Sequence, residues 1–269
     1  MPNALQIGSL VLPVSLLFMF FAVIAAASIG KWAGRRVGID VEPILFQTLI
    51  VGVGVVVARL AFVLQFSTAY QLSPLAVLDV RDGGWRPLAG FAAAWIYAFV
   101  MLLKRPVMRN PLLAAVFAGT IIWAGGILAL SFSRDEQMLP TLALSSPQGA
   151  TVDLKQFKGK PMVVNLWATW CPPCVREMPV LHEAQAQNPT VNFVFINQGE
   201  SAQRVNGWLA ARNLPLRNVL LDTKGKALDV FNQRGLPTTL FFDSNGKLMS
   251  TRTGELSTAT LAEKLQSIN

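Results

Sequence analysis

Four long apolar stretches in the first half of the chain constrain its fold more than any other feature. They cover residues 7–30, 44–66, 87–103 and 111–132. A helix of about 20 apolar residues is long enough to cross the hydrocarbon core of a membrane, and the third stretch is only slightly short of that length. Four such stretches within residues 1–133 are more than the buried helices of a soluble protein account for. We therefore expect an α-helical membrane domain of four transmembrane helices.

The composition of the chain changes at about residue 133. Charged residues make up 14% of the whole chain, whereas about a quarter is usual in soluble proteins. Residues 1–133 carry 9 Lys and Arg and 4 Asp and Glu, and residues 134–269 carry 14 and 11. The second half therefore has the charge density of an ordinary soluble domain. We expect two domains, a four-helix transmembrane domain over residues 1–133 and a soluble domain over residues 134–269.

Basic residues between the apolar stretches predict the orientation in the membrane, because cytoplasmic loops are enriched in Lys and Arg. The loop at 31–43 carries Lys31, Arg35 and Arg36, and the loop at 104–110 carries Lys104, Arg105 and Arg109. The two arginines of the loop at 67–86, Arg81 and Arg86, are offset by Asp79 and Asp82.

The first and third loops are therefore predicted to face the cytoplasm, which places both termini and the soluble domain on the other side of the membrane. In a two-membrane bacterium this is a multi-pass inner-membrane protein whose soluble domain is periplasmic. The first stretch has no basic residue before it and is followed by three more, unlike a cleavable signal peptide. Membrane topology accounts for most of the excess positive charge, so the bilayer is the expected partner and nucleic acid is not.

The second half alternates between strand and helix patterns. Apolar runs at 162–167 and 191–196 are typical of buried strands, and a turn at 244–246 between two apolar runs predicts a β-hairpin. Helical spacing marks residues 171–187, 203–212, 227–231 and 256–265, with a short strand at 219–221. This order predicts an α/β domain with a mixed sheet and helices on both faces.

Two cysteines, Cys171 and Cys174, stand in the segment WCPPC directly after a predicted buried strand and at the start of a helix. The free N–H groups and the dipole of a helix N-terminus stabilise a thiolate, so Cys171 is the expected nucleophile. Cys174, one turn inside the helix, is the expected resolving thiol. The alternative to a redox-active pair is a disulfide between Cys171 and Cys174 that has only a structural role. Zinc is not expected, because two cysteines and the single histidine, His182, supply too few ligands.

The second half resembles the thioredoxin fold, specifically the membrane-anchored TlpA/ResA-like thiol:disulfide reductases of the bacterial envelope. The matching segments are KGKP at 158–161, VVNLWATWCPPC at 163–174, EMP at 177–179 and GLPTT at 235–239. The resemblance implies that Pro237 is a cis proline beside the Cys171 sulfur. It also implies that Glu177 is an acidic residue that tunes the thiols or carries a proton; a solvent-facing helix position is the alternative.

The resemblance assigns further positions around the cysteine pair. Asn165 stands where thioredoxins have a buried carboxylate, a departure that the TlpA/ResA-like group shares. The side chains expected to contact the substrate are Trp170, Pro172, Pro173 and Leu236.

The expected activity is the reduction of protein disulfides by the Cys171–Cys174 dithiol without a cofactor or metal. The same pair kept oxidised would make the protein an oxidase, and a non-catalytic binding module is a third possibility. Residues 1–133 contain no cysteine, so electrons from the cytoplasm require a partner, by family analogy a DsbD- or CcdA-like transporter. Family analogy also indicates substrates such as apocytochrome c, copper-assembly proteins or a disulfide isomerase.

Residues 1–103 have a fainter resemblance to the prolipoprotein diacylglyceryl transferase (Lgt) family. It rests on QIG at 6–8, VARLAFVL at 57–64, SPLAVL at 73–78 and RDGG at 81–84, and on it Arg59 matches an arginine of that family. The family's histidine is replaced within LAG at 88–90, so we expect lipid transfer to be lost; a transferase with a thioredoxin-like appendage is the alternative. Arg59 lies inside an apolar stretch, where a charge marks either function or a side chain that reaches the headgroups.

Overall fold

The structure is a computed structural model that describes residues 4–7, 10–38, 43–71, 74–79, 82–104, 106–132 and 137–268. The described chain separates into two compact units. The first comprises Met1–Leu72 and Gly84–Arg134, and the second comprises Ser73–Gly83 and Asp135–Asn269. The predicted boundary near residue 133 falls among residues 133–136, which lie outside the described residues, as do Arg81 and Arg105 of the predicted loops.

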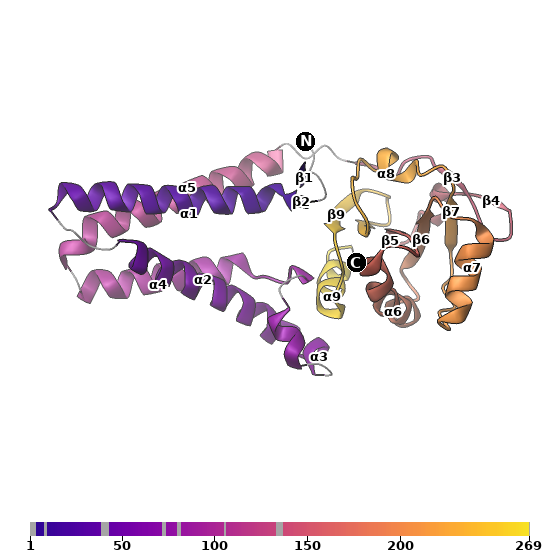
Figure 1. The fold of residues 1–269 in the computed structure, drawn as a ribbon, viewed down its shortest axis with the longest axis horizontal. Helices are drawn as coiled ribbons and strands as arrows, with labels where there is room; N and C mark the ends of the chain where they lie inside the picture. The colour runs from indigo at the N-terminus through magenta and orange to yellow at the C-terminus, as the bar shows by residue number, and fades with distance from the viewer. Residues whose placement is uncertain are drawn as a thin grey trace. The chain divides into compact units, whose positions relative to one another are not determined.

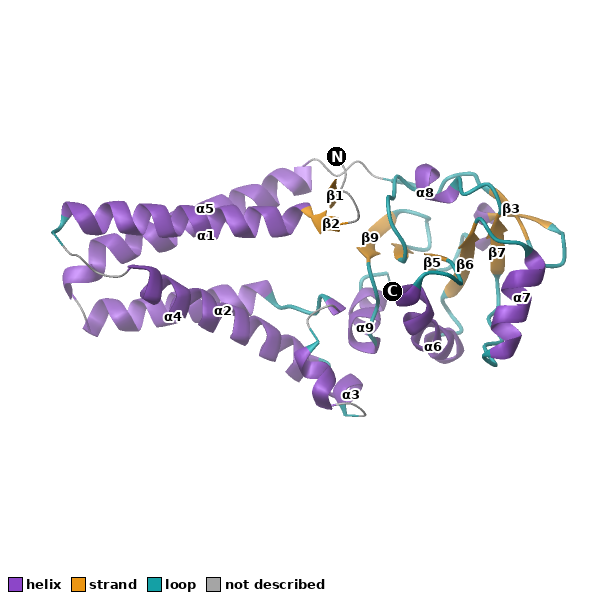
Figure 2. Cartoon of the chain, in the orientation of Figure 1, coloured by secondary structure: helices purple, strands orange, loops and turns teal. Residues whose placement is uncertain are grey.

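The first unit is made mainly of long helices (Figures 1 and 2). Its elements are β1 (Ala4–Ile7), β2 (Leu10–Pro13), α1 (Val14–Arg36), α2 (Pro43–Gln65), α3 (Ser67–Tyr70), α4 (Pro87–Lys104), the 3-10 turn η3 (Pro106–Met108) and α5 (Arg109–Phe132). The strands β1 and β2 pair antiparallel. The contacts between helices are mainly those of α1 with α5 and of α2 with α4.

Three helices of the described chain are long and apolar enough to cross a membrane. These segments are Leu17–Arg36, Pro87–Lys104 and Pro106–Leu130, and α2 contributes a shorter apolar segment, Val51–Gln65. The fourth predicted span therefore stays a prediction.

The first predicted helix is wrong at both ends. Residues 10–13 form the strand β2, and α1 begins only at Val14, directly after Pro13. Proline lacks the N–H that a helix interior needs, so it marks a natural start for the helix. At the other end, Lys31, Arg35 and Arg36 belong to α1 and are not in a loop.

Small residues bring α2 and α4 close together. A Cβ on Gly90 would lie 2.5 Å from the carbonyl oxygen of Gly54, and a Cβ on Gly54 would lie 3.1 Å from that of Gly90. A larger side chain at Gly90 would therefore push the two backbones apart. Close approach through small residues is the usual way in which apolar helices pack in a membrane.

The second unit is a seven-stranded mixed sheet with helices on both faces (Figures 1 and 2). Its strands are β3 (Ala143–Ser145), β4 (Thr151–Asp153), β5 (Met162–Trp167), β6 (Asn192–Gln198), β7 (Val219–Asp222), β8 (Thr238–Phe242) and β9 (Leu248–Thr253). They lie in the order β4-β3-β7-β6-β5-β8-β9. The helical elements are η1 (Pro74–Leu78), η4 (Leu154–Phe157), α6 (Pro172–Gln187), α7 (Ala202–Ala211), α8 (Ala227–Val230) and α9 (Thr258–Gln266).

The strand β5 lies at the centre of this unit, parallel to β6 on one edge and antiparallel to β8 on the other. All six of its residues are buried. Val163 and Trp167 face a hydrophobic cluster that includes residues of α6, α7 and α9. Met162, Val164 and Leu166 face a second cluster that includes Ala227 of α8 and Leu154 of η4. The alternation of a strand thus supplies both hydrophobic layers.

The predicted α/β class and the helices on both faces are confirmed, and each predicted strand and helix of the second half is present within a few residues. The sequence did not indicate β3 or β4, because strands of three residues are too short to show a periodic pattern. These two strands extend the sheet beyond β7 and do not touch the cysteine pair.

Candidate functional site

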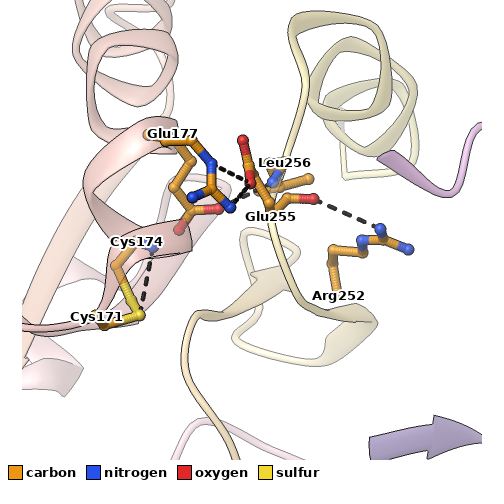
Figure 3. A network of polar contacts seen from close by, with 7 residues as sticks. Cys171, Cys174, Glu177, Arg252, Glu255 and Leu256 are labelled. Carbon is orange, nitrogen blue, oxygen red and sulfur yellow. Dashed lines mark hydrogen bonds and ion pairs between the residues drawn. A yellow bond between two sulfur atoms is a disulfide. The ribbon is translucent and has the colours of Figure 1, made fainter. Parts of the chain in front are cut away.

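The two cysteines lie at the junction between β5 and α6 and form a disulfide, with their sulfurs 2.06 Å apart (Figure 3). Cys171 is the N-cap of α6, and its Sγ accepts a hydrogen bond from the backbone N–H of Cys174 at 3.3 Å. Pro172 and Pro173 occupy the first helical positions, where an N–H has no helical partner to lose. The predicted placement of the pair at a helix N-terminus is confirmed.

The pair is asymmetric in its exposure. Cys171 is 4% exposed and lines a cavity, whereas Cys174 is fully buried. After reduction, a thiolate on Cys171 would keep the N–H of Cys174 as a donor and would lie at the positive end of the helix dipole. The arrangement therefore favours Cys171 as the nucleophile that reacts with a substrate disulfide and Cys174 as the buried resolving thiol.

Glu177 is a fully buried carboxyl one turn after Cys174 on α6 (Figure 3). Its Oε1 accepts from Nδ2 of Asn165 on β5 at 2.8 Å, and its Oε2 accepts from the backbone N–H of Leu256 at 2.9 Å. Asn165 Nδ2 also donates to Thr239 Oγ1 on β8 at 2.9 Å. The solvent-facing alternative for Glu177 is therefore wrong, because the chain around Leu256 covers this face of α6.

Burial raises the pKa of Glu177 from 4.5 to about 8, because the charged form loses the solvation it has in water. The hydrogen bonds from Asn165 and Leu256 oppose this shift, as does the positive charge of Arg252, and the negative charge of Glu255 adds to it. Burial outweighs the two donors. Glu177 thus holds a proton at neutral pH in the disulfide state.

A second buried carboxyl, Glu200, holds the loop that leads to Cys171, and the sequence did not single it out. The N–H of Thr169 donates to its Oε2 at 2.7 Å, and the Thr169 hydroxyl donates to its Oε1. Asn197 Nδ2 donates at 2.7 Å, and Nε of Arg204 at 3.0 Å. Burial alone would raise the pKa of Glu200, but these hydrogen bonds outweigh it and hold the pKa below 4.5.

The position of Glu200 explains why it was missed. Glu200 lies 31 residues after Thr169 in the chain, and only the pairing of β5 with β6 brings the two strand ends together. The one available signal was an acidic residue just past the end of a predicted buried strand, where loops of a parallel sheet meet at a common edge.

A cavity of about 530 Å³ opens beside Cys171. It is lined by residues 170–173, residues 198–199, Gly225, Leu228 and residues 234–236. The structure therefore brings together the four side chains predicted to contact the substrate, Trp170, Pro172, Pro173 and Leu236. Of the other lining residues, the sequence singled out only Cys171, the expected nucleophile.

The peptide bond between Leu236 and Pro237 is cis, as the family resemblance implied. Pro237 is buried directly after the cavity-lining residue Leu236 and directly before β8. His182, for which the sequence indicated no role, is partly exposed on α6.

The raised pKa of Glu177 predicts how folding stability depends on pH. The folded, oxidised protein binds this proton more tightly than the unfolded chain does. The stability from Glu177 is therefore complete below about pH 4.5 and is lost as the pH rises through about 8. In urea unfolding of the oxidised protein in detergent, the wild type should lose several kcal/mol relative to Glu177→Gln between about pH 5 and about pH 9. The exposed Glu183→Gln on the same helix is the control, and parallel pH curves for wild type and Glu177→Gln would contradict the prediction.

The lowered pKa of Glu200 predicts that its contribution to folding stability changes with pH in the opposite direction. Its contribution is present above pH 4.5 and is lost as the pH falls through the lower folded-state pKa. Glu200→Gln replaces one acceptor oxygen with a donor beside groups that already donate, so we expect stability at pH 7 to fall by about 2 kcal/mol. That difference should shrink in acid. The exposed Asp229→Asn should change stability by less than about 0.5 kcal/mol. A Glu200→Gln protein as stable as the wild type would show that the carboxylate does not hold the loop.

Comparisons with known proteins identify relatives of the second half of the chain. The Redoxin family description matches residues 134–265. The thiol-disulfide oxidoreductase ResA from Geobacillus thermodenitrificans is 30% identical over 169 residues, which cover 61% of this chain and 97% of that protein. ResA from Bacillus cereus is 29% identical over 144 residues, which cover 51% of this chain and 83% of that protein. Among solved structures, the exposed lipoprotein thioredoxin Etrx1 from Streptococcus pneumoniae is similar with a TM-score of 0.43 and 25% identity, covering 47% of this chain and 98% of that one.

The matched region contains the cysteine pair, Glu177, Glu200 and the cavity beside Cys171, and the match extends over nearly the whole length of the Geobacillus protein. The chain therefore belongs to the ResA family of thiol-disulfide oxidoreductases.

Proposed function

We propose that this protein is a membrane-anchored reductase of disulfides in proteins outside the cytoplasm. The observation that carries the proposal is the asymmetry of the cysteine pair. Cys171 lines an open cavity at the N-terminus of α6, Cys174 is fully buried behind it, and the buried carboxyl of Glu177 follows one turn later. These are the parts that a two-step thiol–disulfide exchange requires.

In the first step, the Cys171 thiolate attacks one sulfur of the substrate disulfide. The substrate S–S bond breaks, a mixed disulfide between Cys171 and that sulfur forms, and the other substrate sulfur leaves as a thiolate that takes a proton from solvent. The N–H of Cys174 stabilises the attacking thiolate, because it already donates to Cys171 Sγ. The cavity around Trp170 and Leu236 holds the substrate chain.

In the second step, which begins with Glu177 as the ionised carboxylate, the Cys174 thiol gives its proton to that carboxylate, and the resulting thiolate attacks Cys171 Sγ. The mixed disulfide breaks, the second substrate sulfur leaves as a thiolate, and the Cys171–Cys174 disulfide forms. Two electrons have then passed to the substrate. A pKa of about 8 for Glu177 in the disulfide state is what a carboxyl that ends the step protonated requires.

Asn165 suits both protonation states of Glu177. Its Nδ2 donates to Glu177 Oε1, and its own buried Oδ1 has no hydrogen-bond partner within the described structure. Half a turn of the amide would present that oxygen to a protonated Glu177. A carboxylate at position 165 would repel the ionised form of Glu177, whereas the amide can hydrogen-bond to both forms.

Continued turnover as a reductase requires an external dithiol, because these 269 residues contain only the two cysteines. We propose a DsbD- or CcdA-like membrane donor, and substrates among envelope proteins such as apocytochrome c, copper-assembly proteins or a disulfide isomerase. An oxidase would use the same residues in reverse, and the reduction potential sets the direction.

The apolar helices support the membrane anchor. Three of them are long enough to span, and we propose α2 as a fourth span, with both termini and the second unit in the periplasm of an inner-membrane protein. The resemblance of residues 1–103 to the Lgt family stays a prediction, and we assign these residues an anchoring role and no transferase activity.

Replacing each cysteine with serine should impair the reaction at a different step. Cys171→Ser should lower the rate of reduction of a disulfide-bonded peptide by at least about 1000-fold, because no nucleophile remains at the cavity. Cys174→Ser should instead accumulate a covalent mixed disulfide with the peptide through Cys171, visible by mass spectrometry of the non-reduced protein. His182→Ala on the same helix is the control and should react like the wild type. A mixed disulfide on Cys174 in Cys171→Ser, or full activity without Cys171, would contradict the assignment.

The redox state of the pair in growing cells tests the direction. After acid quenching and alkylation with a mass tag, we expect mostly reduced cysteines, which should become oxidised when the membrane donor is deleted. A pair that is mostly oxidised in both strains would mean that the protein donates disulfides, and would overturn the reductase assignment.

A further inference from the structure

The cavity beside Cys171 has one charged side chain among its lining residues, Arg234. Arg234 is exposed and precedes Leu236, which lines the same cavity, by two residues. Within the described part of the chain, no hydrogen bond or ion pair engages its guanidinium. An arginine presents five donors in a planar fork that suits a carboxylate. A side chain that can bind a negative group of the substrate therefore lines the same cavity as Cys171.

Other charged side chains in the same segment of the chain add to the positive charge of Arg234. Among the exposed charged side chains of residues 223–236, Lys224, Lys226 and Arg234 are positive and Asp229 is negative. Two other acidic side chains, Asp222 and Glu200, are buried, and each already accepts hydrogen bonds from the protein. Asp222 Oδ2 accepts from the N–H of Ala227 at 2.6 Å, and Glu200 holds the loop at Thr169. The N-terminus of the 16-residue helix α6 adds positive potential at Cys171. The mouth of the cavity thus attracts a negative group.

The rest of the cavity is suited to a polypeptide chain. Trp170, directly before Cys171, is 62% exposed, and Leu228 and Leu236 line the same space. Such an exposed ring offers contact to an apolar side chain. Gln198 is 5% exposed, and its Oε1 has no hydrogen-bond partner among the described residues. Gln198 Oε1 can therefore accept a hydrogen bond from a backbone N–H of the substrate at the wall of the cavity.

We infer that this site selects polypeptide disulfides in which an acidic residue stands next to the attacked cysteine, with Arg234 as the residue that determines this specificity. The inference rests on the proposed function and narrows its substrate class. A carboxylate paired with Arg234 as the mixed disulfide forms would favour acidic over basic flanks by about 3–10-fold at low ionic strength. Salt would reduce the preference, because the pair is exposed to solvent.

The test uses the full-length protein in detergent and three disulfide-bonded peptides that differ only in the residue after the attacked cysteine, which is Asp, Asn or Lys. The value of kcat/KM is measured for each peptide at about 20 mM and about 500 mM salt. Each value is divided by the rate of the same peptide with dithiothreitol, because a neighbouring carboxylate changes the reactivity of the sulfur itself. The variants are Arg234→Gln and Arg234→Glu, with Arg212→Gln, an exposed arginine that stacks on Trp208, as the control.

We expect the wild type and Arg212→Gln to prefer Asp over Lys by about 3–10-fold at low salt. Arg234→Gln should remove most of the preference, and Arg234→Glu should invert it. Equal normalised rates for the three peptides with the wild type, or a preference that survives in both Arg234 variants, would overturn the inference and leave the reductase proposal standing. Failure to reduce any of the three peptides would overturn both.

Discussion

All six residues of β5 are buried, with hydrogen-bonded strands on both edges and a hydrophobic cluster on each face. The position of the cysteine pair depends on this strand, because only four residues separate its last residue, Trp167, from the first residue of α6. Asn165 on the same strand donates to Glu177 on α6 and to Thr239 on β8, which follows the cis proline. A shift of β5 by one residue would exchange its two faces and place Asn165 in the opposite hydrophobic cluster.

Two buried carboxyls near this strand are driven in opposite directions by their surroundings. Glu177 has two donors and a largely apolar setting, and its pKa rises to about 8. Glu200 has donors from Thr169, Asn197 and Arg204, and its pKa falls below 4.5. Glu177 is thus protonated at neutral pH in the disulfide state, as the proposed proton transfer requires, whereas Glu200 is ionised and ties the loop before Cys171 to the end of β6. The number and kind of hydrogen-bond donors decides between these roles, as it does in other enzymes with paired acids.

The first unit contains a charged residue, Arg59, that the sequence singled out and that the structure shows to be buried. Arg59 is 7% exposed, and its guanidinium donates to the carbonyl oxygen of Gly84 at 2.8 Å. The rings of Phe62, Tyr70 and Trp85 lie within 5.6 to 5.9 Å of it. This side chain therefore contacts other residues of its unit, and the alternative of an arginine that reaches the headgroups stays a prediction. Enclosure by aromatic rings and a carbonyl reduces the cost of a charge in an apolar stretch.

Several features could be predicted from the sequence alone: the apolar stretches, the buried strands 162–167 and 191–196, the hairpin near 244–246 and the cysteine pair at a strand–helix junction. Each of these depends on a pattern within about twenty neighbouring residues, so a periodicity or a motif records it. The one misplaced helix, at residues 7–30, shows the limit of such a pattern, because an apolar run does not show where a proline lets the helix begin.

Contacts between distant parts of the chain could not be predicted from the sequence and come from the folded structure. Thr169 and Glu200 meet because β5 pairs with β6, and Glu177 is buried because the chain around Leu256 covers it from 79 residues away. Gln198, at the end of β6, and Arg234, in the segment before β8, both line the Cys171 cavity. Desolvation and charge depend on everything that surrounds a group in space, and the sheet brings those surroundings together from distant parts of the chain. The two sulfurs and Glu177 were therefore indicated by the sequence, whereas the burial that raises the pKa of Glu177, the contacts of Glu200 and the place of Arg234 in the cavity wall were not.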